Sequence, residues 1–339
     1  MTTPSSAVSA AARSPDVRAL LAGIAEGAAE RERRDESPFA QVAAVAKAGL
    51  GALSLPVDEG GQGASVRELL AFVIDLAEAD PIVAHVLRTH YSQVLGFLRS
   101  PDPDVRRRWL DRVRSGTVLG NAISETGPSA AGGHEYDTRL DEVDGRLVLN
   151  GTKYYSTGTL YADWIAVAAR VEGDLVATVM VPADRAGVSV VDDWDGMGQS
   201  RTGTGTTTFT DVVVDPDDVL SRRPRLEPRA PGDVAFLQLY LHALVAGILR
   251  SVVADATGVV RSRSRTFEHA PAPRAVDDPI LHEKVGTLAA TAWIAESAVL
   301  AAADAVQAAM DAAAVVRDRT SPAASVTTER STPATTACR

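Results

Sequence analysis

Apolar residues recur every three or four positions in the first part of the chain, as at Val17, Leu20 and Ile24. This spacing places apolar side chains on one face of a helix. Asp80-Pro81 marks a helix boundary, because proline disfavours helical geometry in the residue before it. Residues 15–116 are therefore predicted to form an N-terminal helical domain.

From about residue 117 the apolar period changes to two and β-branched residues become frequent, which is typical of strands. Asp144-Gly145 lies between two alternating segments and gives the strongest hairpin signal in the chain. Further strands are predicted at residues 164–171, 175–181 and 206–214. Residues 117–222 are thus predicted to form a middle β-domain, antiparallel because its strands follow one another without intervening helices.

The helical period returns after Pro231, over residues 234–250 and again over the alanine-rich residues 280–316. Residues 231–317 are predicted to form a C-terminal helical domain. The fold class is therefore α+β, in the order helices, sheet, helices. Residues 1–14 and 318–339 lack apolar periodicity and are predicted to be disordered.

Composition narrows the function classes. The 339 residues carry a formal net charge of -10, which argues against a nucleic-acid partner. The six histidines show no metal-ligand spacing, and the single cysteine, Cys338, cannot form an internal disulfide. The start of the chain lacks the apolar stretch of a signal peptide, and no later run is expected to be long enough to span a bilayer. A cytoplasmic protein without a metal or a membrane partner is therefore expected.

The Ser/Thr/Gly-rich segment Asn121–Gly127 offers backbone amides and short hydroxyls, which can hydrogen-bond the polar edge of a flavin ring. Two further segments follow it, Asn150–Gly158 and Asp193–Thr202. In this order they resemble the acyl-CoA dehydrogenase superfamily over residues 15–316. The sequence Tyr154-Tyr155-Ser156-Thr157-Gly158 is closest to the reduced-flavin monooxygenases typified by dibenzothiophene monooxygenase.

The resemblance implies which residues form the site. His90, Tyr91 and Ser156 are the expected catalytic residues. Residues expected to bind the cofactor are Tyr91, Asn121, Ala122, Ile123, Ser124, Glu125, Thr126, Thr152, Lys153, Tyr154, Tyr155, Ser156 and Trp194. Arg261, Arg263 and Arg265 fall where the family places an arginine on a flavin phosphate, and Arg263 and Arg265 are the preferred candidates.

The implied function is a two-component monooxygenase. A separate NADH-dependent reductase would supply reduced FMN, and this chain would use O2 to oxygenate a small organosulfur compound. Residues 125–135 are expected to act as a lid that keeps water out. The resemblance also implies a homotetramer.

Two alternatives stay open at this point. An FAD-dependent acyl-CoA dehydrogenase would need a glutamate base in the C-terminal helices, for which Glu283 and Glu296 are available. The chain also ends before a further helical segment that the resembled monooxygenases carry, as a truncation would leave it. An inactive flavin-binding remnant is therefore the second alternative.

Overall fold

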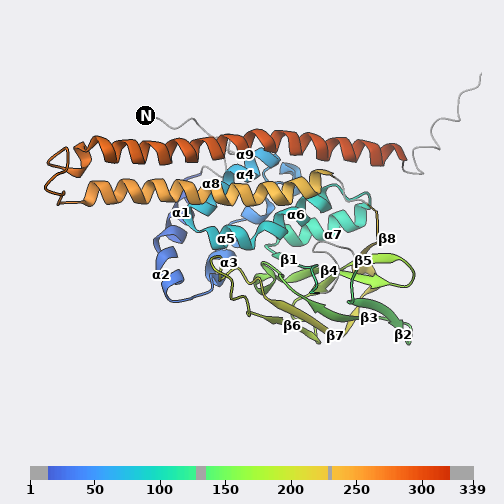
Figure 1. Ribbon diagram of the computed structural model, residues 1–339. Helices are drawn as coiled ribbons and strands as arrows, with labels where there is room; N and C mark the ends of the chain where they lie inside the picture. Colours follow the sequence, from blue (N-terminus) through green and yellow to red (C-terminus); the bar gives the residue numbers. More distant parts are fainter. Residues whose placement is uncertain (1–13, 127–134, 228–230, 321–339) are drawn as a thin grey trace, which may run out of the picture.

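The computed structural model describes residues 14–126, 135–227 and 231–320. A layer of N-terminal helices lies between a sheet and a long helical hairpin (Figure 1). The α+β prediction and the order helices, sheet, helices are confirmed. The expected lid falls mostly on residues 127–134, and both termini expected to be disordered fall largely on residues 1–13 and 321–339. These segments lie outside the described residues.

The N-terminal layer contains helices that begin at polar caps. Ser65 and Glu68 form a capping box on the buried central helix, and Asp80 caps the helix that starts at Pro81. The helices are α1 (Pro15–Glu26), α2 (Ala28–Arg33), α3 (Phe39–Lys47), α4 (Val66–Ala79), α5 (Pro81–Val86), α6 (Arg88–Leu98) and α7 (Pro103–Arg114). The short α5 meets α6 at Leu87, and we call this junction the α5–α6 corner.

The sheet has the order β6-β7-β3-β2-β4-β5-β8, with β1 paired to β4. Its strands are β1 (Leu119–Ala122), β2 (Arg139–Val143), β3 (Arg146–Lys153), β4 (Trp164–Val171), β5 (Leu175–Pro182), β6 (Val188–Val191), β7 (Thr206–Val214) and β8 (Val219–Pro224). The β2–β3 hairpin turns at Asp144 and Gly145, which both have positive φ, as predicted.

The prediction of a purely antiparallel domain needs one correction. β1 pairs with β4 in parallel, and so does β2 at one residue pair. The β2–β3 hairpin separates β1 from β4 in the chain, so the chain can return and run in the same direction. This parallel pair sets the end of β1 beside the turn that follows β3.

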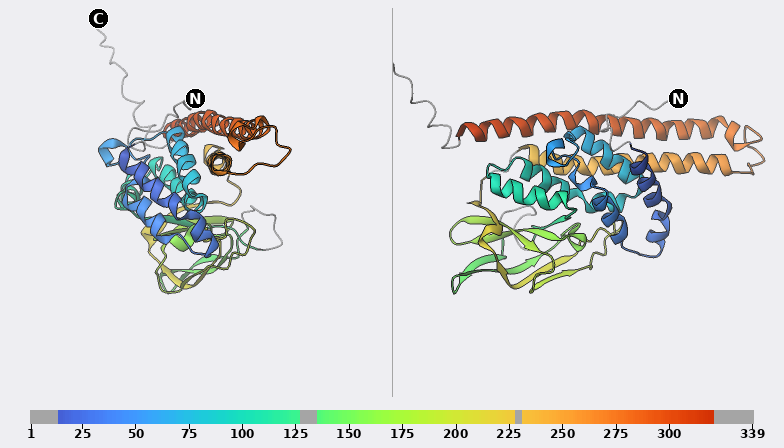
Figure 2. Two further views of the ribbon diagram at one scale, coloured as in Figure 1. Left: turned by 90° about the vertical axis from the view of Figure 1, so that its left-hand side faces the viewer. Right: turned by 180° about the vertical axis from the view of Figure 1, so that it is seen from behind.

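Two long antiparallel helices, α8 (Pro231–Ser262) and α9 (Pro279–Thr320), lie across the N-terminal helices and extend beyond them (Figures 1 and 2). Gly247 of α8 packs so closely on α4 that an added Cβ would lie 2.5 Å from the Cβ of Ala77. The expectation that no run is long enough to span a bilayer needs a correction, because both long helices could cross a membrane by length and composition alone. Such helices also occur in helical bundles without a membrane, so this finding is weak evidence.

A stack of aromatic rings joins the helical layer to the sheet. Trp109 of α7 stacks on Phe97 of α6 at 5.3 Å and meets the edge of Trp164 of β4 at 5.0 Å. The guanidinium of Arg112 lies 4.1 Å from the Trp164 ring. This contact fixes α6 and α7 against β4 and its neighbour β1.

Candidate functional site

The three segments expected to line a flavin meet at the junction of sheet and helices, and the third of them, Asp193–Thr202, lies in the loop between β6 and β7. The Tyr154 amide donates to the Ser124 carbonyl at 2.9 Å. The Ser156 amide donates to the Gly205 carbonyl at 3.2 Å, which ties the turn after β3 to the β6–β7 loop. We call this junction the seam. Residues far apart in the sequence are thus brought together as expected.

The α5–α6 corner closes one side of the seam. Gly158 has φ of 82°, and a Cβ added there would lie 2.3 Å from the carbonyl oxygen of Val86. Only glycine allows this approach. The close contact places the side chains of the corner beside the turn that carries Ser156.

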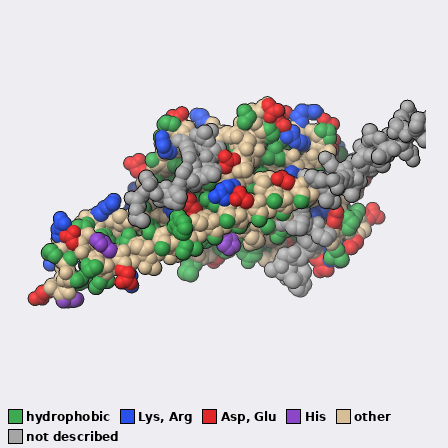
Figure 3. Space-filling model, turned by 90° about the horizontal axis from the view of Figure 1, so that it is seen from above, with side chains coloured by type: hydrophobic (Ala, Val, Ile, Leu, Met, Phe, Trp, Pro, Cys, Tyr) green, Lys and Arg blue, Asp and Glu red, His purple; other side chains and the backbone are tan. Residues whose placement is uncertain are grey.

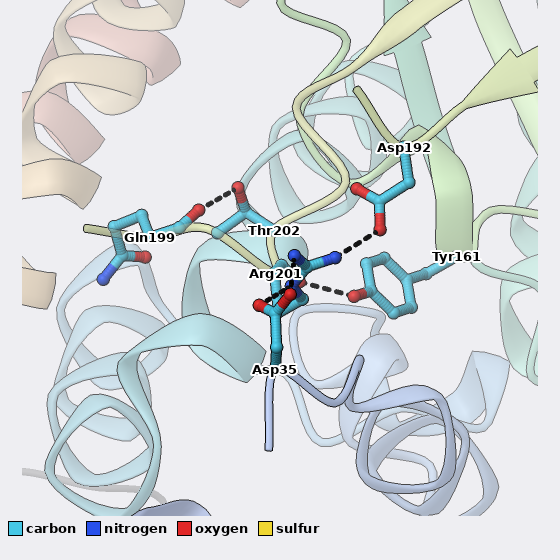
Figure 4. A network of polar contacts seen from close by, with 6 residues as sticks. All are labelled: Asp35, Tyr161, Asp192, Gln199, Arg201 and Thr202. Carbon is cyan, nitrogen blue, oxygen red and sulfur yellow. Dashed lines mark hydrogen bonds and ion pairs between the residues drawn. The ribbon is translucent and has the colours of Figure 1, made fainter. Parts of the chain in front are cut away.

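The loop between β6 and β7 is anchored by a network of polar contacts (Figure 4). Arg201 forms ion pairs with Asp35 and with Asp192, the second at 3.0 Å. The Tyr161 hydroxyl donates to the Arg201 carbonyl, and the Thr202 hydroxyl donates to the Gln199 carbonyl at 2.8 Å. Because both ends of the loop are held, Gln199 has a defined place at the seam.

His85 is a site residue that the sequence reasoning missed. Its Nδ1 lies 3.0 Å from Oε1 of Gln199, and the ring is half-buried. Burial lowers the pKa of His85, so the ring is neutral at pH 7. Helical spacing could have found it, since His85, Arg88 and Thr89 are three and four residues apart on one side of the corner.

Ser156 carries the observation that fits a cofactor best. Its side chain is 1% exposed, yet its Oγ has no hydrogen-bond partner among the described residues. Trp194 Nε1 is buried without a partner in the same way. The exposed Tyr155 ring meets Trp194 edge-on at 6.0 Å. Buried polar atoms normally have partners, so these two donors fit the polar edge of an isoalloxazine ring.

Lys153 and Glu125, both expected to bind the cofactor, bind each other instead. Lys153 Nζ lies 2.6 Å from a Glu125 oxygen, and the lysine is fully buried. Burial lowers the pKa of Lys153 to about 8. Glu125 also accepts hydrogen bonds from the amides of Asp137 and Thr138. The pair therefore ties β3 to the segment after β1, which is a structural role.

His90 and Tyr91, expected to be catalytic, point into the protein. His90 Nε2 lies 3.0 Å from the Gly51 carbonyl, and Nδ1 accepts the Leu119 amide at 3.2 Å. The Tyr91 hydroxyl donates to the Leu50 carbonyl at 3.1 Å. All three polar side-chain atoms are occupied by backbone groups, and both side chains are 1% exposed. The geometry does not support contact of either with a flavin.

The remaining expected residues divide by exposure. Ala122 is fully buried in the sheet, whereas Ser124 and Thr126 are exposed. Asn121, Ile123, Thr152 and Tyr154 are half-buried along the seam and its strands. Their placement is compatible with the expected contact without testing it.

Arg263 and Arg265 follow the end of α8, at the tip of the hairpin and away from the sheet (Figure 1). Arg263 Nε donates to the Arg265 carbonyl at 2.8 Å, and its guanidinium lies 5.1 Å from the Phe267 ring. Helix α8 continues twelve residues past the predicted end at Arg250, which carries these arginines outward. Within one chain they do not reach the seam.

The architecture is that of the acyl-CoA dehydrogenase-type flavoproteins. It consists of N-terminal helices, a sheet and a helical hairpin, with a polar seam where the helices meet the sheet. The chain belongs to the acyl-CoA dehydrogenase family. It matches the N-terminal domain of that family over residues 16–117 and the middle domain over residues 122–212.

Three relatives are among the most similar. The probable FMNH2-dependent monooxygenase SfnC of Pseudomonas putida is 28% identical over 276 residues, which are 79% of this chain and 67% of that protein. FMN-bound TdsC from Paenibacillus sp. A11-2 has a TM-score of 0.78 at 30% identity, covering 86% of this chain and 76% of that one. Methanesulfinate monooxygenase MsuC from Pseudomonas fluorescens has a TM-score of 0.76 at 25% identity, covering 88% and 76%.

Proposed function

We propose that this chain is the oxygenase component of a two-component flavin monooxygenase. It would take reduced FMN and O2 and place one oxygen atom on a small organosulfur compound. The observation that carries the proposal is the buried, unpartnered Ser156 hydroxyl at the seam. The fold matches that of a structure that holds FMN, and two relatives are named for FMNH2 or for a sulfinate.

The residues of the seam would divide the work. Ser156 and Trp194 would hydrogen-bond the polar edge of FMN, and Tyr155 would pack beside it. When bound, reduced FMN supplies the two electrons that activate O2. His85 is neutral and is held by Gln199, so it can orient a polar group at the cofactor without adding charge. The packed α5–α6 corner would exclude water from this side.

The dehydrogenase alternative has less support. Glu296 lies 3.9 Å from Arg250 in an ion cluster with Asp75 and Glu78, on the side of α8 that faces α4 and α9. Glu283 is exposed near the tip of the hairpin. Neither candidate base has a contact with the seam among the described residues.

A homotetramer and a cytoplasmic location complete the proposal. Apolar side chains lie exposed along α8 and α9, between charged ones (Figure 3). They include Val245, Val252, Val259, Trp293 and Ile294. Assembly of the long helices would cover this surface, and the hairpin tip could bring Arg263 and Arg265 to the FMN phosphate of another subunit. A separate NADH-dependent reductase would supply the reduced cofactor.

Titration of the full chain with reduced FMN and with reduced FAD under anaerobic conditions tests the proposal. We expect tighter binding of FMN. Mixing the complex with O2 and an organosulfur compound should then give an oxygenated product that mass spectrometry identifies. Binding without product would instead favour the inactive remnant, and acyl-CoA oxidation with FAD would favour the dehydrogenase.

A further inference from the structure

Arg88 is a cation at the α5–α6 corner that the proposed function does not use. It is the first residue of α6 and lies one helical turn after His85. Its side chain is half-buried, and its Nε is buried without a hydrogen-bond partner among the described residues. No aspartate or glutamate of the described chain forms an ion pair with it. A buried N–H normally has a hydrogen-bond partner, so the buried Nε–H of Arg88 can donate to a group from outside the chain.

Arg88 has neighbours on both α5 and α8. It lies within electrostatic range of His85 on α5 and of Tyr240 on α8. His85 contacts Gln199 of the β6–β7 loop, and the Tyr240 hydroxyl donates to the Ala84 carbonyl at 2.7 Å. Arg88 therefore lies near α8 and near His85, the residue of the corner that contacts the β6–β7 loop.

The electrostatics of this place favour an anion. The ring of His85 is neutral at pH 7, and the buried Tyr240 hydroxyl has a raised pKa and stays protonated. Burial lowers the pKa of Arg88, although arginine keeps its charge at neutral pH. Among the described residues, the positive charge of Arg88 thus has two neutral polar neighbours and no carboxylate partner. A planar guanidinium matches the paired oxygens of an oxyanion.

We propose that Arg88 binds the anionic group of the substrate, and that the substrate is an organic sulfinate. This inference rests on the proposed function and names its substrate class. The sulfinate sulfur carries a lone pair, which would form a new S–O bond to one atom of O2. The O–O bond breaks and the second oxygen leaves as water, while reduced flavin supplies two electrons and two protons. The product is the sulfonate.

A pair of matched compounds tests the inference on the full chain by calorimetry. Benzenesulfinate is an anion, and methyl phenyl sulfoxide is a neutral analogue in which a methyl group replaces the anionic oxygen. Wild-type protein should bind the sulfinate at least about tenfold more tightly than the sulfoxide, since a hydrogen bond to a charged group has that strength. Arg88→Met should remove the preference and leave sulfoxide binding unchanged.

Two further variants keep the result decisive. Arg88→Lys retains the positive charge and loses the two parallel N–H donors of the guanidinium, so sulfinate affinity should fall severalfold. This variant keeps the test available if Arg88→Met does not fold. Arg67→Met is the matched control, because Arg67 pairs with Asp304 between α4 and α9. It should keep the full preference. Equal sulfinate binding by wild type and both Arg88 variants, or a wild-type preference for the sulfoxide, would overturn the inference.

The experiment also separates the inference from the proposed function. Calorimetry needs no flavin chemistry, so binding of benzenesulfinate that depends on Arg88 stands even if no sulfonate forms. In that case the proposed oxygenation is wrong, while the role of Arg88 in binding the sulfinate stands. If instead the sulfoxide is oxygenated and Arg88→Met leaves the KM for the sulfinate unchanged, the role of Arg88 fails alone.

Discussion

His85 and His90 lie five residues apart at the same helical corner, yet their environments differ. Both ring nitrogens of His90 are bonded to backbone groups, of Gly51 and of Leu119. Within the described part of the chain, His85 bonds only the side chain of Gln199, and it borders the seam. A histidine whose nitrogens are both held by backbone has no atom left for a ligand. His85, about one and a half helical turns away, still has a ring nitrogen that can contact a ligand.

The same contrast appears in the sheet. Lys153 and Glu125 satisfy each other and nearby backbone groups, whereas Ser156, three residues after Lys153, is equally buried and has no partner among the described residues. Buried polar groups that have hydrogen-bond partners stabilise the fold. Buried polar groups without partners at a junction mark a place where a ligand can supply the missing hydrogen bond. The predictions below test this division of roles.

The largest effect is expected at the start of the corner, where Asp80 accepts from buried Arg31 at 2.7 Å and caps α5. Asp80→Ala would leave the guanidinium of Arg31 buried without its partner and remove the cap. We expect it to lower the free energy of unfolding by about 3–5 kcal/mol in urea denaturation. Asp104→Ala, which removes an exposed pair with Arg107, should cost less than about 1 kcal/mol. Similar losses in both variants would contradict the assignment.

His90 should make stability depend on pH. Burial lowers its pKa from the ordinary value of 6.5 to about 4. Between these values the unfolded chain binds the proton and the folded chain does not, so stability is lost as the pH falls from 6.5 toward 4. The shift corresponds to a loss of about 3 kcal/mol. Unfolding curves of His90→Gln should be flatter in this window, and an unchanged pH dependence would show that His90 is not the cause.

His85→Gln should have the opposite profile. Loss of the contact with Gln199 at the partly open seam should change the free energy of unfolding by less than about 1 kcal/mol. Oxygenation of the organosulfur compound should fall about tenfold, because a polar group beside the cofactor is lost. Steady-state kinetics with denaturation of the same sample separates the two effects. If the variant loses stability and keeps its oxygenation rate, His85 stabilises the fold and does not take part in the reaction.

Much of the fold could be predicted from the sequence, because periodicity records which face of an element is buried. The turn between β2 and β3 lies at Asp144 and Gly145, the two residues that the sequence predicts. The extension of α8 past Arg250 was missed because residues 251–262 lie largely beyond the packed body and carry no clear apolar stripe. The strands β6 and β8 were missed because they are short and only half-buried.

The segments expected at the candidate site lie together, whereas the directions of their side chains could not be predicted. The segments that the resemblance names include the turn after β3 and the β6–β7 loop, which meet at the seam. It did not reveal that Lys153 points to Glu125, or that His90 points to Gly51. Those directions depend on strand register and on how α6 packs against β1, which spacing along one segment does not determine.

Ser156→Ala gives the smallest effect and the most direct test of the seam. The hydroxyl has no partner among the described residues, so its removal should leave the free energy of unfolding within about 0.5 kcal/mol of wild type. If it meets the FMN edge, the variant should bind reduced FMN severalfold more weakly in an anaerobic fluorescence titration. Thr207→Val, which removes another buried hydroxyl without a partner among the described residues, serves as the control and should leave FMN affinity unchanged. Equal FMN affinity in Ser156→Ala and wild type would mean that this hydroxyl, although unpartnered, does not face the cofactor.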